Sequence, residues 1–496
     1  GDAGLDDLLL HAITSHHGYG RPFAPVSTDA VPSTVRGGHG GVAIDVSAGD
    51  RAGWLSAHSL ASGVTERFWR LTRRYGWWGL AYLEAILRLS DWYGSSRWVL
   101  DKAPEKTDPA PGLLPHKVAD SSGKSLVLEG IDGANPLGFL AAVGVLVTAQ
   151  GTGEMNIRLS WRRGPTWVPV IDGAAAITHE AFSETIAHGL RGCNVSAEAE
   201  KRREHAQKDF DAAGTAIKKK KKEIKNRGLS RNDRQKAIES EVRPLEEERE
   251  QKRKVWLQTL AAAVPRSELA LGKRLNCTSE EYRAHASAFL AKADWARRDA
   301  VDLLAAFGSD AYSKEKSDPI DPTPFCFISG GGHQEFLDTV RKLVGRVSEE
   351  SVKRALFELW IYRDPGLSMR WDPIEDKRYA LSDVKPADEG ASTVWMANLL
   401  AYRALALFPS VPARGGLVTV GWAQEEGESY FTWPLWSWPL DPDSVRSLFL
   451  LPELYLREPD RFALRARGVD ATFRSRRIKV GTGANFKINF SPARAV

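Results

Sequence analysis

The chain has 496 residues, 43% of them hydrophobic and 26% charged, which is enough for two to four domains with buried cores. Its three cysteines lie far apart and form no CxxC pair, which argues against a disulfide framework or a zinc ribbon and fits a reducing cytoplasm. No apolar run approaches the roughly 18 residues needed to span a bilayer, and no signal peptide precedes the first helix. The composition therefore predicts a soluble, cytoplasmic protein without a membrane partner.

The net charge of +5 is unevenly distributed along the chain. Between Lys201 and Lys254 there are 19 Lys or Arg against 11 Asp or Glu, and between Arg465 and Lys487 seven basic residues accompany one acid. The rest of the chain is net acidic. Localised basic patches indicate a polyanionic partner such as nucleic acid, although a solvated helix face gives the same pattern.

The first 100 residues have the pattern of a helical domain, with helices expected over Asp6–Thr14, Trp54–Arg74 and Trp77–Trp98. His16 and His17 stand at the end of the first helix, where both imidazole rings can converge on one ion. Asp91 would add a carboxylate from the last helix. These three residues are candidate ligands of a divalent transition metal, and the alternative is that they are surface or capping residues.

After the helical domain, the sequence predicts a linker and then a clearly marked helix start. Residues 101–124 carry four prolines among charged and small residues, which is typical of a linker. Leu126–Ile131 then has the pattern of a short buried strand, and Asn135 and Pro136 are the residues favoured at the N-cap and at the first helical position. Such a turn can bind an anion or simply cap a helix, and no phosphate-loop motif is present.

The next segments predict an α+β base and then a helical hairpin. Strands are expected over Asn156–Trp161 and Thr166–Ile171, and a helix over Ile177–Leu190. Residues 197–263 are almost continuous helix formers, interrupted at Asn226–Ser230 and kinked near Pro244. Near the tip, Lys218, Lys219, Lys220, Lys221 and Lys222 form a run of like charge. A phosphate backbone would relieve their repulsion, and plain solvation is the alternative.

The C-terminal region mixes helices with aromatic-rich strands. Helices are expected over Ser279–Ala293, Trp295–Phe307, His333–Val344, Glu349–Tyr362 and Trp395–Leu407. Alternation in the last basic segment places Phe473, Ser475, Arg477 and Lys479 on one face of a strand and Arg474, Arg476 and Ile478 on the other. Because burying unpaired guanidinium groups is costly, these four cations are candidate nucleic-acid ligands, and pairing with nearby acids is the alternative.

The sequence as a whole predicts an α+β protein in five parts: a helical fragment 1–100, a linker 101–124, an α+β opening unit 125–195, a basic helical hairpin 196–264 and a mixed helical and β region 265–496.

Three ordered strings carry a resemblance to a known family. LEGIDGANPLGFLAAVGVL in the opening unit, RWDPIEDKRYAL at Arg370–Leu381 and ANLLAYRALALFPSVP at Ala397–Pro412 resemble the large subunits of type I CRISPR Cascade complexes of the I-G (I-U) branch. The resemblance extends over Leu126–Val496. It implies a cytoplasmic binding and assembly protein of antiviral defence, which helps recognise the motif flanking the target, open the duplex, hold the displaced strand and recruit a nuclease.

A second resemblance concerns the N-terminal fragment. SHHGYGRPF and RFWRLTRRYGWWGLAYLEAILRLSDWYGS resemble the C-terminal half of the HD nuclease domain of the type I CRISPR helicase–nuclease. It implies a metal-ligand role for His16, His17 and Asp91. The family also has an earlier His and a His-Asp dipeptide, and both are missing from this chain. We therefore expect a fusion in which helicase and HD residues precede Gly1 in the native chain.

The expected partners are the guide-RNA complex with its other Cascade subunits, target double-stranded DNA and the helicase–nuclease. DNA binding itself would need no cofactor, and a divalent transition metal enters only if the HD site is completed. The chain alone is not expected to be an enzyme. The alternative function is a metal-dependent HD phosphohydrolase or DNase completed by an upstream or separate polypeptide.

Overall fold

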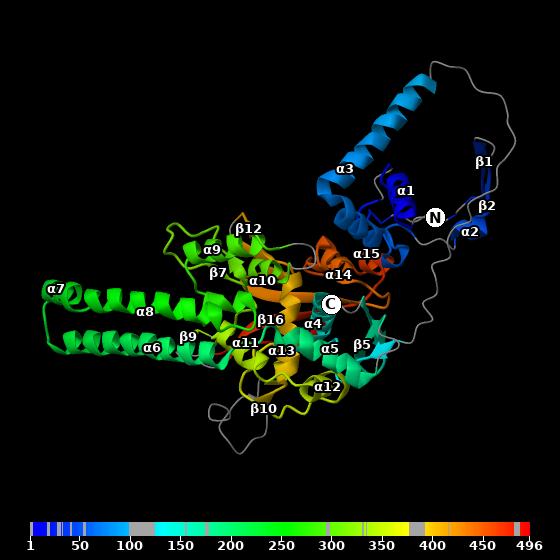
Figure 1. The fold of residues 1–496 in the computed structure, drawn as a ribbon. Helices are drawn as coiled ribbons and strands as arrows, with labels where there is room; N and C mark the ends of the chain where they lie inside the picture. Colours follow the sequence, from blue (N-terminus) through cyan, green and yellow to red (C-terminus); the bar gives the residue numbers. More distant parts are fainter. Residues whose placement is uncertain are drawn as a thin grey trace.

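The computed structural model describes residues 3–16, 20–26, 31, 33–39, 42–52, 56–98, 125–153, 156–173, 178–293, 298–329, 332–333, 335–375, 392–414, 416–480 and 487–496. The predicted linker 101–124 and the predicted ligand His17 lie outside these residues. The described chain is an α+β protein, as predicted. It consists of a central body, a long helical hairpin that projects from it and an N-terminal helical part (Figure 1).

The N-terminal part is built on two helices, α1 (Ala3–His16) and α3 (Val64–Trp98). Between them lie the antiparallel pair β1 (Val35–His39) and β2 (Val42–Val46) and the short α2 (Ala48–Ala52). The sequence analysis missed this pair, because β1 contains two glycines and strand interiors disfavour glycine. Trp54, where a helix was expected to begin, lies outside the described residues, and the α-helix begins only at Val64, because Gly63 just before it adopts a left-handed φ of 70°. The expected break between two helices is confirmed at Gly76.

The opening unit contains α4 (Pro136–Thr152), which begins as predicted. The Asn135 side chain accepts hydrogen bonds from the backbone N–H groups of Leu137 (2.8 Å) and Gly138 (3.3 Å). From Pro136 to Ala149 every residue of α4 is buried, so the helix has no solvent face. The expected strand Leu126–Ile131 is reduced to β3 (Leu126–Val127), because Gly130 instead donates its N–H to the carbonyl of Leu356 at 2.9 Å.

The hydrogen bond between Gly130 and Leu356 also explains why the predicted end of another helix was wrong. The helix predicted over Glu349–Tyr362 ends at Phe357, and the chain turns into extended backbone at Glu358. The carbonyl of Leu356 is thereby free of the helix ladder and accepts the N–H of Gly130. A long-range contact, invisible to local propensity, therefore sets the end of this helix.

The remaining helices of the body are α5 (His179–Arg191), η2 (Ser267–Leu271), α9 (Ser279–Leu290), α10 (Asp299–Phe307), α11 (Phe336–Val344), α12 (Glu349–Phe357), η3 (Pro373–Glu375), α13 (Trp395–Ala404), η5 (Leu405–Leu407), α14 (Pro442–Leu448), η6 (Pro452–Leu454) and α15 (Arg461–Arg467).

The strands of the body are β4 (Arg158–Arg163), β5 (Trp167–Asp172), β6 (Gly308–Ser309), β7 (Asp321–Pro322), β8 (Ile328–Ser329), β9 (Gly332–His333), β10 (Asp364–Pro365), β11 (Ser392–Thr393), β12 (Ser410–Ala413), β13 (Gly416–Thr419), β14 (Trp422–Glu425), β15 (Glu428–Trp436), β16 (Val469–Val480), β17 (Lys487–Phe490) and β18 (Arg494–Ala495).

Two sheets meet around α4. The larger has the order β14-β15-β16-β17-β8-β9, with β18 beside β16, and the smaller has the order β3-β5-β4. The predicted strand pair of the opening unit is confirmed as β4 and β5. Phe139 of α4 stacks on Trp161 of the small sheet at 5.6 Å and lies 5.9 Å from Trp433 of the large one. The opening unit and the C-terminal region therefore share one core.

Two tryptophan side chains of β15 attach the large sheet to the opening unit. Trp433 donates its indole N–H to the carbonyl of Gly133 (2.9 Å), and Trp436 donates to the carbonyl of Leu159 (2.8 Å). Both side chains are fully buried.

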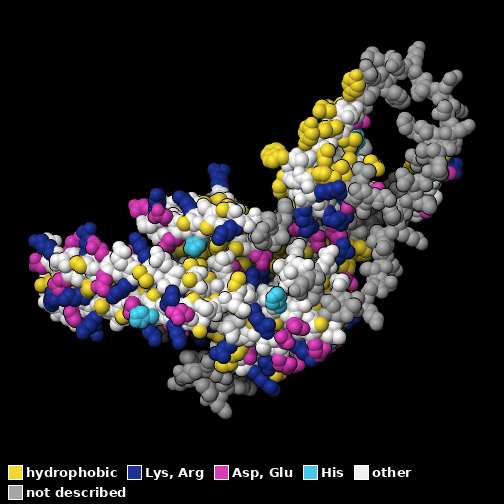
Figure 2. Space-filling model, in the orientation of Figure 1, with side chains coloured by type: hydrophobic (Ala, Val, Ile, Leu, Met, Phe, Trp, Pro, Cys, Tyr) yellow, Lys and Arg dark blue, Asp and Glu magenta, His cyan; other side chains and the backbone are white. Residues whose placement is uncertain are grey.

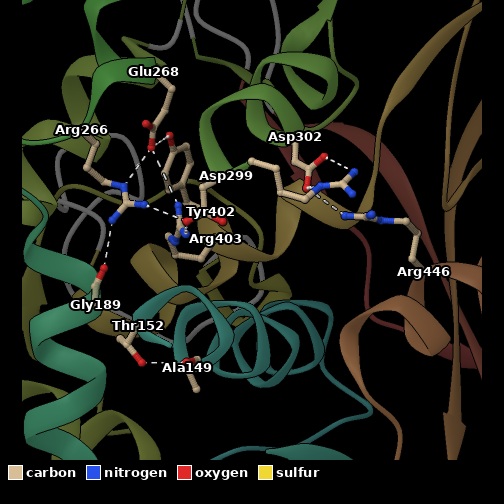
Figure 3. A network of polar contacts seen from close by, with 11 residues as sticks. Ala149, Thr152, Gly189, Arg266, Glu268, Asp299, Asp302, Tyr402, Arg403 and Arg446 are labelled. Atoms are coloured by element: carbon tan, nitrogen blue, oxygen red, sulfur yellow. Dashed lines mark hydrogen bonds and ion pairs between the residues drawn. The ribbon is translucent and has the colours of Figure 1, made fainter. Parts of the chain in front are cut away.

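A buried ionic network ties α10 and α13 to η2 (Figure 3). Arg266 contacts Glu268 at 2.9 Å and Asp299 at 3.4 Å, and Arg403, which is 1% exposed, also binds Asp299. Tyr402 donates its hydroxyl to Glu268 at 3.2 Å. The charges of this group balance, which is the condition for burying them.

The N-terminal part contacts the body mainly through polar groups. Arg73 of α3 pairs with Asp443 of α14 at 3.1 Å, and Trp69 donates its indole N–H to Ser447 at 2.8 Å. Arg158 of β4 pairs with Glu66 at 2.9 Å. Interfaces inside a chain that are this polar resemble those between separate domains.

The hairpin comprises α6 (Ala197–Asn226), α7 (Arg231–Glu241) and α8 (Arg243–Ala262). The predicted turn is confirmed after Asn226, and the predicted kink at Pro244 separates α7 from α8. The seam holds only two small apolar clusters, one around Trp256 near the body and one around Ile224 near the tip. Lys, Arg, Asp and Glu side chains are interspersed along the hairpin surface (Figure 2).

Among the helices of the described residues, none combines the length and apolar character needed to cross a lipid bilayer.

The closest approach in the core generates a stability prediction. A Cβ on Gly144 of α4 would overlap the backbone carbonyl of Leu400 on α13. We expect Gly144→Ala to destabilise the body by about 3 kcal/mol or more, because neither helix backbone can move away. Thermal unfolding monitored by near-UV circular dichroism measures the change.

Gly79→Ala is the matched control, because this glycine is also helical and its Cβ would meet only Tyr75 at an ordinary 3.4 Å. Removing a helical glycine without a clash should leave stability unchanged or raise it by up to ~1 kcal/mol. Equal midpoints for the two variants would contradict the close packing of α4 on α13.

Candidate nucleic-acid interface

The predicted lysine run lies on α6, one to two turns from the hairpin tip. Lys220 pairs with Glu241 at 3.0 Å and Lys221 pairs with Glu246 at 2.7 Å across the hairpin. Lys218, Lys219 and Lys222 are exposed and form no ion pair with any described residue. The run is therefore divided: two lysines stabilise the hairpin, and three present uncompensated charge to solvent.

Glu241 also accepts two hydrogen bonds from Arg227 beyond the turn. These bonds and the one from Lys220 lower the pKa of Glu241 to about 2, so its carboxylate stays charged at any physiological pH. The acids of α7 and α8 thus hold the tip of the hairpin together and leave part of the lysine run available.

The predicted cations of the C-terminal strand lie on β16 but differ in environment. Arg474 is only 2% exposed, and its guanidinium donates to the hydroxyl of Thr432 at 3.0 Å and to the carbonyls of Arg457 (3.0 Å) and Leu456 (2.9 Å). The expectation that Arg474 faces nucleic acid needs correction. Backbone carbonyls, which the sequence analysis did not consider, satisfy this buried cation.

The other three cations of β16 are more accessible. Arg476 is half-exposed and pairs with Glu428 of β15 at 2.5 Å, which lowers the pKa of Glu428. Arg477 lies with its guanidinium 5.5 Å from the ring of Phe327, and burial lowers its pKa. Lys479 is exposed. Within the isolated chain, Arg476 therefore pairs with an acid, which is the alternative to a nucleic-acid contact given by the sequence.

The predicted metal ligands are partly brought together. His16 ends α1 and Asp91 lies on α3, and the His16 Nε2 and Asp91 Oδ2 atoms are 3.5 Å apart. Two ligands of one tetrahedral ion at bond lengths of about 2.1 Å are separated by about 3.4 Å, so this pair fits two corners of such a site. The described residues contain no group of three or more His, Cys, Asp or Glu that could hold a metal ion.

The seam between α1 and α3 gives this pair a second interpretation. Earlier along the same two helices, Asp7 pairs with Arg70 at 2.9 Å and His11 pairs with Glu84 at 2.7 Å. Burial alone would raise the pKa of Glu84, but hydrogen bonds from Arg21 and His11 outweigh it and lower the pKa. His16 and Asp91 continue this series, so the pair also serves to hold α1 on α3.

Sequence reasoning missed a junction between two of the strings that carry the family resemblance. Asp372 is fully buried and accepts hydrogen bonds from the Asn135 amide (2.9 Å), the Tyr362 hydroxyl (2.8 Å) and the backbone N–H of Ile374 (3.0 Å). Burial raises its pKa. No local pattern predicts this junction, because 237 residues separate Asn135 from Asp372 along the chain.

Comparison with known proteins adds no relative: no protein-family model and no curated protein matches this chain. The site is therefore interpreted from its own geometry and from the ordered strings.

The buried position of Arg474 generates a prediction. Arg474→Met should destabilise the body by about 3 kcal/mol, because it leaves a buried hydroxyl and several buried carbonyls without their donor. Arg476→Gln removes the same charge from the next residue and should leave the midpoint of thermal unfolding unchanged, because an exposed ion pair adds little. If Arg474→Met had the same midpoint of thermal unfolding as the wild type, the hydrogen bonds from Arg474 to the backbone carbonyls would not contribute to stability.

Proposed function

We propose that this chain is the large subunit of a CRISPR guide-RNA surveillance complex. In this role it contributes to recognition of the motif flanking the target, to duplex opening, to binding of the displaced strand and to recruitment of a helicase–nuclease. Base pairing with the guide reads the target sequence in such systems, and protein contacts read the short flanking motif and the backbone.

The observation that supports the proposal most is the meeting of the three ordered strings. The first string forms α4 and its cap, the second supplies Asp372 to the cap residue Asn135, and the third forms α13, whose Leu400 carbonyl lies against Gly144. Strings far apart in sequence thus build one centre. If the three strings resembled the family only by chance, there would be no reason for the matching residues to contact one another in the fold.

The exposed lysines of the hairpin also support the proposal. They lie on an arm that projects away from the body (Figure 1), where a nucleic acid bound by other subunits can reach them. Phosphate contacts of this kind position a protein on nucleic acid without reading bases.

Reconstitution tests the proposal directly. The chain is co-expressed with the remaining subunits and the guide RNA, and we expect it to co-elute with them in size-exclusion chromatography. Omitting the chain should weaken binding of the flanked target duplex by at least about 100-fold, since duplex recognition precedes guide pairing. A complex that binds the duplex equally well without the chain would refute the proposal.

The second candidate function is a metal-dependent phosphohydrolase completed by another polypeptide. The 3.5 Å separation of His16 and Asp91 favours it. When bound, the metal would activate a water molecule for attack on phosphorus, and this chain would contribute two of its ligands. The remaining ligands would come from His17, as predicted, and from the polypeptide that supplies the rest of the domain.

Metal content distinguishes this candidate from a purely structural pair. The chain alone should not cut single-stranded DNA, because an incomplete ligand set holds the ion weakly. With the upstream helicase–nuclease polypeptide added, we expect bound transition metal measured by mass spectrometry, lost in His16→Ala and kept in His205→Ala, a histidine on the exposed hairpin. Cutting by the chain alone, or equal metal in both variants, would contradict this assignment.

A further inference from the structure

A groove of about 960 Å³ lies where the hairpin joins the body. Its walls come from α6, from α8 and from the segment that follows η2. Its charged lining comprises six basic side chains, Lys218, Lys221, Arg249, Arg253, Lys273 and Arg274, and three acidic ones, Asp211, Glu250 and Glu335. The groove is therefore basic, and it includes two members of the predicted lysine run.

The charge of the groove is only partly neutralised inside the chain. Four of its six basic side chains have an acidic partner: Lys273 pairs with Asp211 at 3.1 Å, Arg253 with Glu281 at 2.6 Å, Lys221 with Glu246 at 2.7 Å and Arg274 with Glu335 at 3.9 Å. Lys218 and Arg249 are both exposed and form no ion pair with any described residue. Unneutralised cations at the wall of a groove raise the local concentration of anionic ligands.

A column of planar groups stands in the same groove. The rings of Phe210 and Trp256 stack at 5.4 Å with an interplanar angle of 4°. On Phe210 lies the guanidinium of Arg249, 4.7 Å from the ring centroid. A guanidinium that lies over an aromatic ring can receive a nucleobase on its other side, as arginines do in proteins that bind single strands.

Trp256 is the buried end of this stack. It lines the groove but is only 4% exposed, and its indole nitrogen has almost no accessible surface. A ligand in the groove therefore meets the exposed end of the stack, which is Arg249. Trp256 supports Phe210, on which Arg249 lies.

We propose that this groove binds a segment of single-stranded nucleic acid. Lys218 contacts a phosphate of the strand, and the guanidinium of Arg249 stacks on a base. A duplex is a poorer ligand, because its base faces are covered by neighbouring base pairs. The inference rests on the proposed function for its class of ligand and deepens it, because it gives the strand a location.

The test uses the purified full chain and a fluorescein-labelled oligothymidylate of about 20 nucleotides, with affinity measured by fluorescence anisotropy at about 50 mM salt. We expect Arg249→Gln and Lys218→Gln each to weaken binding about 5- to 10-fold. Lys218→Gln removes a phosphate contact and leaves the stack of Phe210 and Trp256 intact. Thermal unfolding verifies that both variants are folded.

Lys254→Gln is the matched control, since Lys254 is an exposed cation of the same helix, outside the groove. It should change the affinity less than about twofold. Wild-type affinity in both groove variants would overturn the proposal. An equal loss of affinity in Lys254→Gln would also overturn it, because binding would then depend on charge alone. Competition by polyglutamate as strong as that by unlabelled oligothymidylate would overturn it too, because the groove would then accept an acidic protein segment equally well.

The outcome is separable from that of the reconstitution experiment. Normal assembly with the guide-RNA complex together with unchanged oligothymidylate binding by the Arg249 variant would refute the groove alone. Failed assembly together with selective loss of binding in the groove variants would refute the proposed function and leave the groove as a single-strand site.

Discussion

The contact between α4 and α13 is the constraint on which the rest of the body depends. Gly144 lets the Leu400 carbonyl approach the α4 backbone so closely that no side chain fits between them. With α13 in place, Arg403 reaches Asp299, and the network of Figure 3 can close over α10 and η2. The hairpin follows directly in space, because η2 continues from the end of α8. One close approach of two backbones thus positions both the ionic centre and the arm.

Local signals predicted those elements whose ends are set by their own residues. The Asn135 cap, the turn after Asn226 and the kink at Pro244 are short-range effects of side chains on the adjacent backbone, and each was found where expected. The end of α12 at Phe357 was not predictable in this way, because its terminal carbonyl is used by Gly130. The same holds for Asp372, whose partner Asn135 comes from another part of the chain.

The candidate site shows a similar division. Alternation along β16 placed Arg474 and Arg476 on one face, yet one is buried under carbonyls and the other is half-exposed beside Glu428. Strand periodicity predicts which face a side chain is on, but not which residues cover that face. Here the covering carbonyls come from Leu454, at the end of η6, and from Leu456 and Arg457 just after it. In the lysine run, pairing of Lys220 and Lys221 depended on which acids the returning helix brings opposite them.

Counting charges along a sequence therefore overstates the charge available to a partner. The acids of α7 and α8 neutralise the cations that face the seam of the hairpin, and those cations fix its geometry. Among the hairpin cations without an ion pair, Lys218 and Arg249 share one groove with the stacked rings of Phe210 and Trp256. Cations beside a planar stack select a ligand more narrowly than a uniformly basic arm would.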